Sequence, residues 1–549
     1  MLAVEPAPRP VARERLSWPA ALLIVAYGAA LYLIILAGGR TLSAHEVWLA
    51  QPAKEMLATG RWLVPTFAGV LCGHKPPLMH WAIALAMALF GSHSEWVARL
   101  PSAVAAVVAA LAVASLAARW LGSRPALLAG VVQLTTVYSL KLGADATPDM
   151  LLCAAVATAL SVFARANLVK VETPGEYRAR PWAARAFYLA SGLAFLAKGP
   201  IGLAFIWIPV GLLVLRQRRT ARFLVDPAGL ALAGVLLGAW PILAYREQPA
   251  VLERWLRDNW GRFHGAMGGE SSPLFYLYTV LWLMLPWTVF CAIGYFALRR
   301  DSQRRELLGF LNAWFISGLA LVTASAFKHW HYLAPALPPL AVLAGQGVSA
   351  YAAWRQREAR PRLALQLLVI ACGSAAGVTA VYGLLPAALA GRAAAVVGLV
   401  AIGLVAALFL ERRGQVHWQL ATWFATAGLA GVLVQGWLMA AHDSWRPYAE
   451  LAERANRIIP PSQPLYLVQL PEHQIAYYLN APLVRTDAVD GFEAAIRDSA
   501  AATTYVMAPQ SVAERLGARH RVEVLDRCAA LRRGMHEAER LALMAVGEK

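Results

Sequence analysis

The sequence predicts a polytopic α-helical membrane protein with a small α/β domain at its C-terminal end, and three observations support this prediction. Hydrophobic residues make up 59% of the 549 residues and charged residues 15%, whereas ordinary soluble domains have about 45–50% and about 25%. Many stretches reach the ~20 apolar residues that cross a bilayer core. Residues 442–549 lose this character. The pattern excludes a soluble globular enzyme, a disordered chain and a fibrous protein.

Hydropathy divides residues 1–441 into thirteen predicted membrane spans. The fifth and sixth are short, and Lys198-Gly199-Pro200 separates them. A basic arm precedes the first long apolar segment, which argues against a cleavable signal peptide. The predicted spans lie near residues 18–37, 97–118, 125–142, 148–166, 185–197, 199–215, 227–245, 274–298, 306–326, 332–351, 363–386, 393–410 and 416–440.

The net charge of +18 has an explanation in the membrane topology. In a soluble protein such a charge would suggest a nucleic-acid partner, but cytoplasmic loops of membrane proteins are rich in Lys and Arg. With the N-terminus in the cytoplasm, basic residues concentrate in the cytoplasmic segments. This orientation places the long loops and residues 442–549 in the periplasm, and we expect no nucleic-acid partner. The five cysteines form no CxxC pair, so a thiolate metal site is not expected.

The segments outside the spans are expected to have structure of their own. In the first loop, residues 38–96, the apolar stretch 76–90 is too short for a span and is marked by Trp and His, which favours a helix lying at the membrane interface. A second outer loop, residues 246–273, is rich in Arg, Trp and Gly. Residues 442–549 alternate strand-like and helix-like runs, which predicts an α/β domain. The clearest of these runs are 447–458, 465–470, 504–507 and 521–525.

Two places in the first loop have residues suited to chemistry. His45-Glu46 follows the first span directly; it is either a solvated helix start or an acid/base pair at the head of a membrane-embedded site. Lys75 precedes Pro76-Pro77, and proline restricts both its own backbone and that of the residue before it. A lysine held in this way suits a phosphate, whereas the alternative is a lysine that snorkels at a helix start.

Together with other segments, these residues resemble the bacterial ArnT-like glycosyltransferases, within the wider protein O-mannosyltransferase-like group that has the GT-C fold. The resemblance covers residues 18 to about 350, and the first-loop pattern is its most specific part. The matching segments, in order, are His45-Glu46, Lys54-Glu55-Met56-Leu57-Ala58-Thr59-Gly60-Arg61-Trp62, Pro65, Lys75-Pro76-Pro77, Trp81, Glu95-Trp96-Val97-Ala98-Arg99-Leu100-Pro101, Ala144-Asp145-Ala146-Thr147-Pro148-Asp149, Ala197-Lys198-Gly199-Pro200, Leu285-Pro286-Trp287 and Lys328-His329-Trp330-His331-Tyr332.

The resemblance implies a multi-pass enzyme of the bacterial inner membrane. Such enzymes move one sugar from a polyprenyl (undecaprenyl) phosphate carrier to a lipid A/LPS-type, glycan or protein acceptor at the periplasmic face. The donor is already activated, and the sequence has neither a P-loop nor a GxGxxG fingerprint. We expect no cofactor. A divalent metal held by histidines and Glu46 is the alternative, but the spacing of His329 and His331 predicts rings on different sides of a helix.

The resemblance also assigns candidate site residues. Lys75 and Tyr332 match positions associated with binding of the carrier phosphate, and Arg262 resembles an arginine of the loop before the eighth span. Lys328 is a further candidate for the phosphate, whereas Lys198 is expected to cap the carbonyls of a helix break. The vicinity of the acceptor would include His74, Asp145 and His331.

The sequence departs from the family at its catalytic motif. The usual pair is Asp-Glu, with the Asp assigned the catalytic role, whereas this chain has His45-Glu46; His74 replaces a residue that is often acidic. Three accounts follow. His45 is itself the base, Glu46 or Asp149 takes over, or the chain is a polyprenyl-phosphate-binding pseudoenzyme. We favour a working enzyme because the cationic and aromatic positions are kept. A lipid-linked sugar transporter or flippase is the other alternative, although the sequence shows no repeat symmetry.

Overall fold

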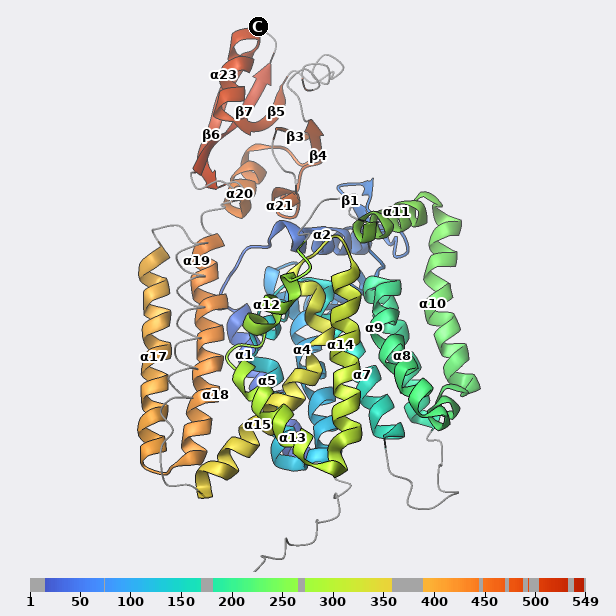
Figure 1. Ribbon diagram of the computed structural model, residues 1–549. Coiled ribbons are helices and arrows are strands. Elements are labelled where there is room, and N and C mark those ends of the chain that lie inside the picture. Colours follow the sequence, from blue (N-terminus) through green and yellow to red (C-terminus); the bar gives the residue numbers. More distant parts are fainter. Residues whose placement is uncertain are drawn as a thin grey trace, which may run out of the picture.

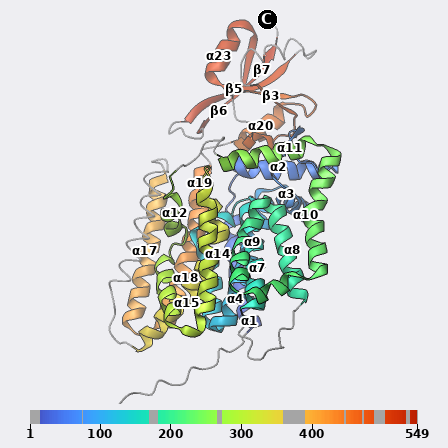
Figure 2. The ribbon, with the colours of Figure 1, turned by 45° about the vertical axis from the view of Figure 1, so that its right-hand side comes forward.

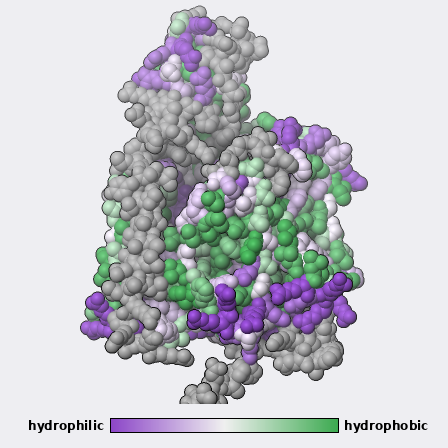
Figure 3. Space-filling model, in the orientation of Figure 1, coloured by the Kyte–Doolittle hydropathy of each residue, from purple (hydrophilic) through white to green (hydrophobic). Residues whose placement is uncertain are grey.

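The computed structural model describes residues 15–73, 75–168, 181–264, 272–357, 389–443, 448–469, 473–486, 492, 503–531 and 538–547. A tall body of helices carries a small sheet domain at one end (Figure 1). An apolar band covers the middle of the visible face of the body, and a hydrophilic band follows its lower edge (Figure 3). This distribution fits a body surrounded by lipid, with polar surface where the helices leave the bilayer.

Within the described residues, seven helical segments are long and apolar enough to cross a membrane, or nine if each of two bent helix pairs is one span. The seven are α1 (Trp18–Leu36), α4 (Glu95–Leu121), α7 (Pro148–Asn167), α10 (Pro227–Glu247), α14 (Arg305–Ala324) with the turn η2 (Ser302–Arg304) before it, α17 (Ala390–Arg412), and the segment formed by α18 (Val416–Val432), η5 (Leu433–Leu438) and α19 (Met439–Asp443).

The remaining helices of the body are bent or shorter. α12 (Phe275–Leu283) and α13 (Thr288–Arg300) meet at 96°, and η3 (Trp330–Ala336) and α15 (Pro338–Arg357) meet at 67°. The shorter helices are α5 (Ser123–Thr135), α6 (Val137–Leu142), α8 (Pro181–Lys198), α9 (Pro200–Arg216) and η1 (Arg218–Leu224). Each predicted span within the described ranges coincides with one of these helices or pairs, and the span predicted at 363–386 lies outside them.

The prediction of a polytopic helical membrane protein is therefore confirmed, and the number thirteen stays a prediction. Small residues let the helices of the body approach closely. Where α13 crosses α15, a Cβ added at Gly294 would lie 1.8 Å from the carbonyl oxygen of Leu343, and one added at Gly347 would lie 2.0 Å from that of Phe290. This crossing leaves no room for a larger residue.

A layer of short elements lies between the helical body and the sheet domain (Figures 1 and 2). It consists of α2 (Ala44–Thr59), the hairpin of β1 (Thr66–Phe67) and β2 (Val70–Leu71), α3 (Leu78–Phe90) and α11 (Ala250–His264). In this layer α2, β1 and α3 share a core with the start of α4 and with Tyr477, and Leu49 and Ala53 of α2 pack there with Met79 and Ile83 of α3. Glu55 holds the hairpin by accepting hydrogen bonds from Thr66 Oγ1 (2.5 Å) and the Ala68 amide (2.7 Å).

The C-terminal part is an α/β domain, as the sequence predicts. Its five-stranded sheet has the order β4-β3-β5-β7-β6; β3 is parallel to β4 and β5, and β7 is antiparallel to β5 and β6. The strands β4 and β7 were not anticipated from the sequence. The elements are α20 (Tyr448–Ile458), β3 (Leu465–Val468), α21 (His473–Ala476), β4 (Leu483–Thr486), β5 (Thr504–Pro509), α23 (Gln510–Arg519), β6 (Arg521–Leu531) and β7 (Ala538–Gly547).

Candidate active site

The start of α2 places the candidate pair His45-Glu46. Ser43 is the N-cap and forms a capping box with Glu46, the arrangement that the spacing Ser-x-x-Glu favours at a helix start. The Ser43 amide donates to Glu46 Oε2 over 2.8 Å. The capping box fixes His45 as the second residue of the helix, where it is exposed, whereas Glu46 is fully buried.

Glu46 is enclosed by hydrogen-bond donors. Arg99 of α4 donates to it from Nε (2.6 Å) and Nη2 (3.1 Å), and the Ala146 amide donates from the loop before α7 (2.9 Å). With the Ser43 amide, each carboxylate oxygen accepts two bonds, which fills the roughly four acceptor sites of a carboxylate. Burial alone would raise the pKa of Glu46, but the Arg99 charge and its hydrogen bonds outweigh burial and hold that pKa below its usual range. Glu46 is therefore an ionised structural anchor.

Arg99 extends this anchor to the end of the first span. Its Nη1 donates to the Arg40 carbonyl oxygen (2.7 Å) and its Nη2 to that of Thr41 (2.8 Å). The Glu46–Arg99 pair thus ties the first loop, α4 and the loop before α7 together. The sequence analysis did not single out Arg99, although an arginine in an otherwise apolar run is a signal of a buried partner.

A second charged group lies where α7 begins and α8 ends. Asp149, in the first turn of α7, accepts a hydrogen bond from Nζ of Lys198, the last residue of α8. This Nζ lies 4.4 Å from the ring centre of Tyr332. Lys75 interacts electrostatically with both Asp149 and His331. We call these five residues (Lys75, Asp149, Lys198, His331 and Tyr332) the Asp149 cluster.

The structure brings together more of the cluster than the sequence analysis expected. Lys75, Asp149, His331 and Tyr332 were candidates from distant segments, and they now share one site. Lys198 was expected to cap a helix break, and instead it pairs with Asp149. The sequence did contain a signal for the role of Lys198, because the segment 197–200 is one of those that resemble the family.

The expectation for the His329 and His331 rings is wrong. The rings stack, with centres 5.2 Å apart and planes inclined by 16°. The reason is that His329 is extended (φ −134°, ψ 144°) and precedes the 3-10 helix η3, so the two-residue spacing does not follow an α-helix. Tyr276 fixes the segment by donating from its hydroxyl to the His329 carbonyl oxygen over 3.1 Å. In the described part of the chain, no three His, Cys, Asp or Glu side chains come together in a group that could hold a metal ion.

The other candidates have other partners in the structure or lie outside the description. Asp145 pairs with Lys141 (2.6 Å) and Arg40 (3.5 Å), and Arg40 also reaches Asp443 (3.1 Å) near the end of α19. Lys328 is buried and donates to the Ser325 carbonyl oxygen over 2.7 Å. Arg262 lies in α11, but its side chain is outside the description, and His74 lies outside the described residues.

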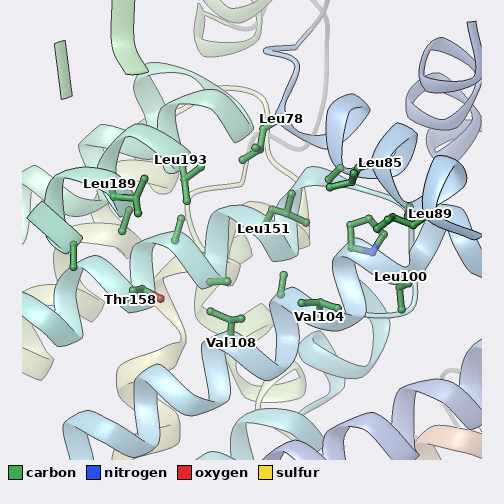
Figure 4. A pocket seen from close by; sticks show the side chains of 18 of the residues that line it. Leu78, Leu85, Leu89, Leu100, Val104, Val108, Leu151, Thr158, Leu189 and Leu193 are labelled. Carbon is green, nitrogen blue, oxygen red and sulfur yellow. The ribbon is translucent and has the colours of Figure 1, made fainter. Parts of the chain in front are cut away.

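An apolar cavity of about 540 Å³ is lined by α3, α4, α7 and α8 (Figure 4). Leu78 and Leu151, which line it, lie three residues after Lys75 and two after Asp149. Other lining side chains, among them Leu85 and Leu89 of α3 and Val104 of α4, are exposed on the outside of the body. The cavity is therefore open to the surface that lipid would cover, and its lining begins within three residues of Lys75 and Asp149 in the sequence.

Comparisons with known proteins agree with this architecture. The family model "Dolichyl-phosphate-mannose-protein mannosyltransferase" matches residues 74–245. A relative from Pseudomonas fluorescens, "Undecaprenyl phosphate-alpha-4-amino-4-deoxy-L-arabinose arabinosyl transferase 1", is 28% identical over 346 residues, which are 60% of this chain and 59% of the relative. The chain thus matches somewhat over half the length of the curated relatives.

Solved structures extend the likeness to nearly the whole chain. The crystal structure of ArnT from Cupriavidus metallidurans in the apo state has a TM-score of 0.80 at 21% identity and covers 95% of this chain and 97% of ArnT. The same protein bound to undecaprenyl phosphate has a TM-score of 0.77 at the same identity and coverage. The comparisons confirm the resemblance inferred from the sequence: the chain is similar to the ArnT-like glycosyltransferases and has the GT-C fold of ArnT.

Proposed function

We propose that this protein is an integral membrane glycosyltransferase that moves a single sugar from an undecaprenyl-type polyprenyl phosphate to a lipid A/LPS-type, glycan or protein acceptor at the periplasmic face of a bacterial inner membrane. The observation that carries the proposal is the Asp149 cluster, together with an apolar cavity that opens toward lipid and whose lining begins within three residues of Lys75 and Asp149 in the sequence. The names of the relatives support it, because they are transferases of a sugar from undecaprenyl phosphate. The ArnT structure with bound undecaprenyl phosphate supports the same class of carrier.

The chemistry of the carrier fits the two parts of the site. A polyprenyl phosphate has an anionic head and a long apolar chain. The cluster has two ammonium groups, Lys75 and Lys198, for one carboxylate, Asp149, so its net charge is positive and suits the anionic head. The cavity offers the apolar chain a lining of Leu, Val and Ala side chains. The opening between α3, α4 and α8 lets the chain enter from the bilayer.

The cluster supplies stabilisation where the reaction develops charge. When the bond between the sugar and the carrier phosphate breaks, the electron pair stays on the phosphate oxygen. Cations fixed near that oxygen stabilise the transition state more than the bound donor. Lys75 and Lys198 take this role, Asp149 orients Lys198, and Tyr332 contacts the phosphate beside them. Arg262 and Lys328 stay candidates for additional cations.

His45 is the proposed base, in preference to Glu46. All acceptor sites of Glu46 are occupied by Arg99 and backbone amides, whereas the His45 imidazole is exposed beside it. His45 takes the proton of an acceptor hydroxyl as its oxygen attacks the anomeric carbon and the carrier phosphate departs, which inverts that carbon. An acceptor phosphate is already anionic, so it does not depend on a strong base for its activation. This would explain why the chain can have an imidazole at the position of the family Asp. His74, Asp145 and His331 stay proposed neighbours of the acceptor.

Lipid mass spectrometry of membranes from a gene-deletion strain tests the function. A single polyprenyl-phosphate sugar should accumulate and should fall again with the wild-type gene. The Lys75→Ala gene should not lower it. The mass of the species identifies the sugar, and a matching loss elsewhere identifies the acceptor. If no lipid-linked sugar changes while the gene is expressed, the proposal fails and a carrier-binding pseudoenzyme or a flippase takes its place.

A further inference from the structure

The sheet domain contacts the first loop through two consecutive tyrosines that follow α21. The Tyr478 hydroxyl accepts a hydrogen bond from the Leu42 amide (2.9 Å) and donates one to Glu95 Oε1 (3.0 Å). Leu42 is 1% exposed and directly precedes the N-cap Ser43. One hydroxyl of the sheet domain thus contacts the backbone just before α2 and the first residue of α4.

Those two contact points belong to the elements that carry the Glu46–Arg99 pair. Leu42 lies four residues before Glu46, and Glu95 lies four residues, or about one helical turn, before Arg99. Tyr478 therefore bridges the elements that bear the two partners of the buried ion pair, from the side opposite the bilayer. It adds a third constraint on the start of α2, after the capping box and the ion pair itself.

Tyr477 makes a different contact beside it. Its hydroxyl donates to the His93 carbonyl oxygen (2.5 Å) in the turn before α4, and Lys54 donates from Nζ to the Tyr477 carbonyl oxygen (3.1 Å). The Tyr477 side chain is buried in the core of the first-loop layer. These two hydrogen bonds link the domain to α2 and to the turn before α4, and neither of them goes to the backbone just before α2.

The sheet domain also braces Tyr478 from its own side. Asn456 of α20 donates from Nδ2 to the Tyr478 carbonyl oxygen (2.9 Å) and accepts from the Asn480 amide (2.9 Å). Tyr478 is therefore held within the folded sheet domain, so the position of its hydroxyl depends on the position of the whole domain.

We propose that Tyr478 is a positioning residue, through which the sheet domain sets the place of the start of α2 and so of the His45 imidazole. The inference rests on the transferase function proposed above, and on His45 as its base. Rates of oriented reactions are sensitive to such placement, since a displacement of about 1 Å can cost about 10²-fold. A domain that only docks would need no hydrogen bond to the backbone three residues before the base.

The test compares Tyr478→Phe with the matched control Tyr477→Phe in the purified full-length protein. Each variant loses one hydroxyl from the same contact, but only the first loses the bond to Leu42. We expect Tyr478→Phe to lower kcat for a hydroxyl acceptor by about 10-fold or more, with KM for the donor within about twofold. Tyr477→Phe should keep kcat within about twofold, and Glu95→Gln should retain most of the activity because its amide oxygen still accepts from Tyr478.

Hydrogen exchange of the amides of residues 42–47 gives a readout that does not depend on turnover. Tyr478→Phe should accelerate it by several-fold more than Tyr477→Phe does. The inference is overturned if both variants change kcat and exchange equally, or if Tyr478→Phe changes neither. Absence of turnover in the wild-type protein would instead contradict the proposed function, and the exchange data would still decide whether Tyr478 holds the start of α2.

Discussion

Two buried carboxylates lie at the same end of the helical body, and comparing them separates structural from chemical roles. Glu46 and Asp149 are both almost inaccessible, at 0% and 5% exposure, and each pairs with a cation. Burial therefore does not distinguish them; their surroundings do. Donors from Arg99 and two backbone amides fill every acceptor site of Glu46. Asp149 instead accepts from Lys198, whose ammonium group also lies over the Tyr332 ring. It also lies near Lys75 and His331.

The comparison distinguishes a carboxylate whose acceptor sites are all filled, which holds segments together, from one whose lysine partner also contacts an aromatic ring, which belongs to the proposed carrier site. Glu46 connects the first loop, α4 and the loop before α7. Asp149 pairs with Lys198, which is proposed to bind the carrier phosphate, and it lies two residues before Leu151 in the lining of the apolar cavity. Substitutions that break one pair at a time should therefore have different effects. Loss of the Glu46–Arg99 pair should lower stability, and loss of the Asp149–Lys198 pair should lower activity.

Glu46→Gln should have the largest effect, and the effect should be on stability. It leaves the Arg99 charge buried without its anion, which typically costs about 3–5 kcal/mol. Thermal unfolding of the purified protein checks this, with Glu46→Gln/Arg99→Met as the control, because removal of both charges should recover part of the loss. A Glu46→Gln protein as stable as the wild type would show that the pair is not an anchor.

Lys198→Met should act mainly on catalysis. Removing one group that stabilises developing charge usually costs about 10²–10³-fold in rate, so kcat/KM for the lipid-linked donor should fall by that factor. Lys141→Met is the matched control: it removes a lysine that pairs with Asp145 at the same end of the body, and it should keep activity within about twofold. Equal losses of kcat/KM in the two variants would show that the change in net charge, rather than the loss of Lys198 from the cluster, lowers the rate.

His45 variants sharpen the contrast between His45 and its neighbour Glu46. His45→Ala should lower transfer to a hydroxyl acceptor by about 10²-fold, with little change in the melting temperature because the side chain is exposed. His45→Asp, which restores the usual family residue, should keep most of the activity. It should also extend activity to lower pH, since carboxyl groups ordinarily titrate well below imidazoles. If His45→Ala is fully active toward hydroxyl acceptors, the proposed base is wrong.

The smallest expected effect is a pH dependence of stability. The pKa of Glu46 is lower in the folded protein than its ordinary value, so its contribution is present above about pH 4.3 and is lost as the pH falls below that. The melting temperature of the wild type should therefore approach that of Glu46→Gln under acidic conditions. If the difference between the two proteins stays constant from pH 7 to pH 3, Glu46 is not ionised in the fold.

The sequence predicts local features of the fold and the site well. Apolar runs locate the helices and the Pro-Pro pair marks Lys75, and the Ser-x-x-Glu spacing of Ser43 and Glu46 would have indicated the capping box. These features depend on neighbours within a few residues. The five-stranded sheet is only partly visible, because its order depends on pairings between distant strands such as β5 and β7.

The partners of the charged residues could not be predicted in this way. Arg99 and Glu46 are 53 residues apart, and Lys198 and Asp149 are 49 apart, so no local pattern joins them. The stacking of His329 on His331 depends on where η3 begins, which hydropathy does not resolve. Tyr478 meets Leu42 across 436 residues, and only the docking of the sheet domain shows why that tyrosine matters.

Turnover by the purified full-length protein in lipid nanodiscs tests the central claim most directly. Undecaprenyl-phosphate-linked sugars are supplied with a lipid A acceptor, and mass spectrometry follows the release of undecaprenyl phosphate. The account predicts that the wild type converts one donor and that Lys75→Ala and Lys198→Met lose most of that turnover while staying folded. A wild-type protein that binds undecaprenyl phosphate but releases no sugar from any donor would contradict it, as would cluster variants that turn over at the wild-type rate.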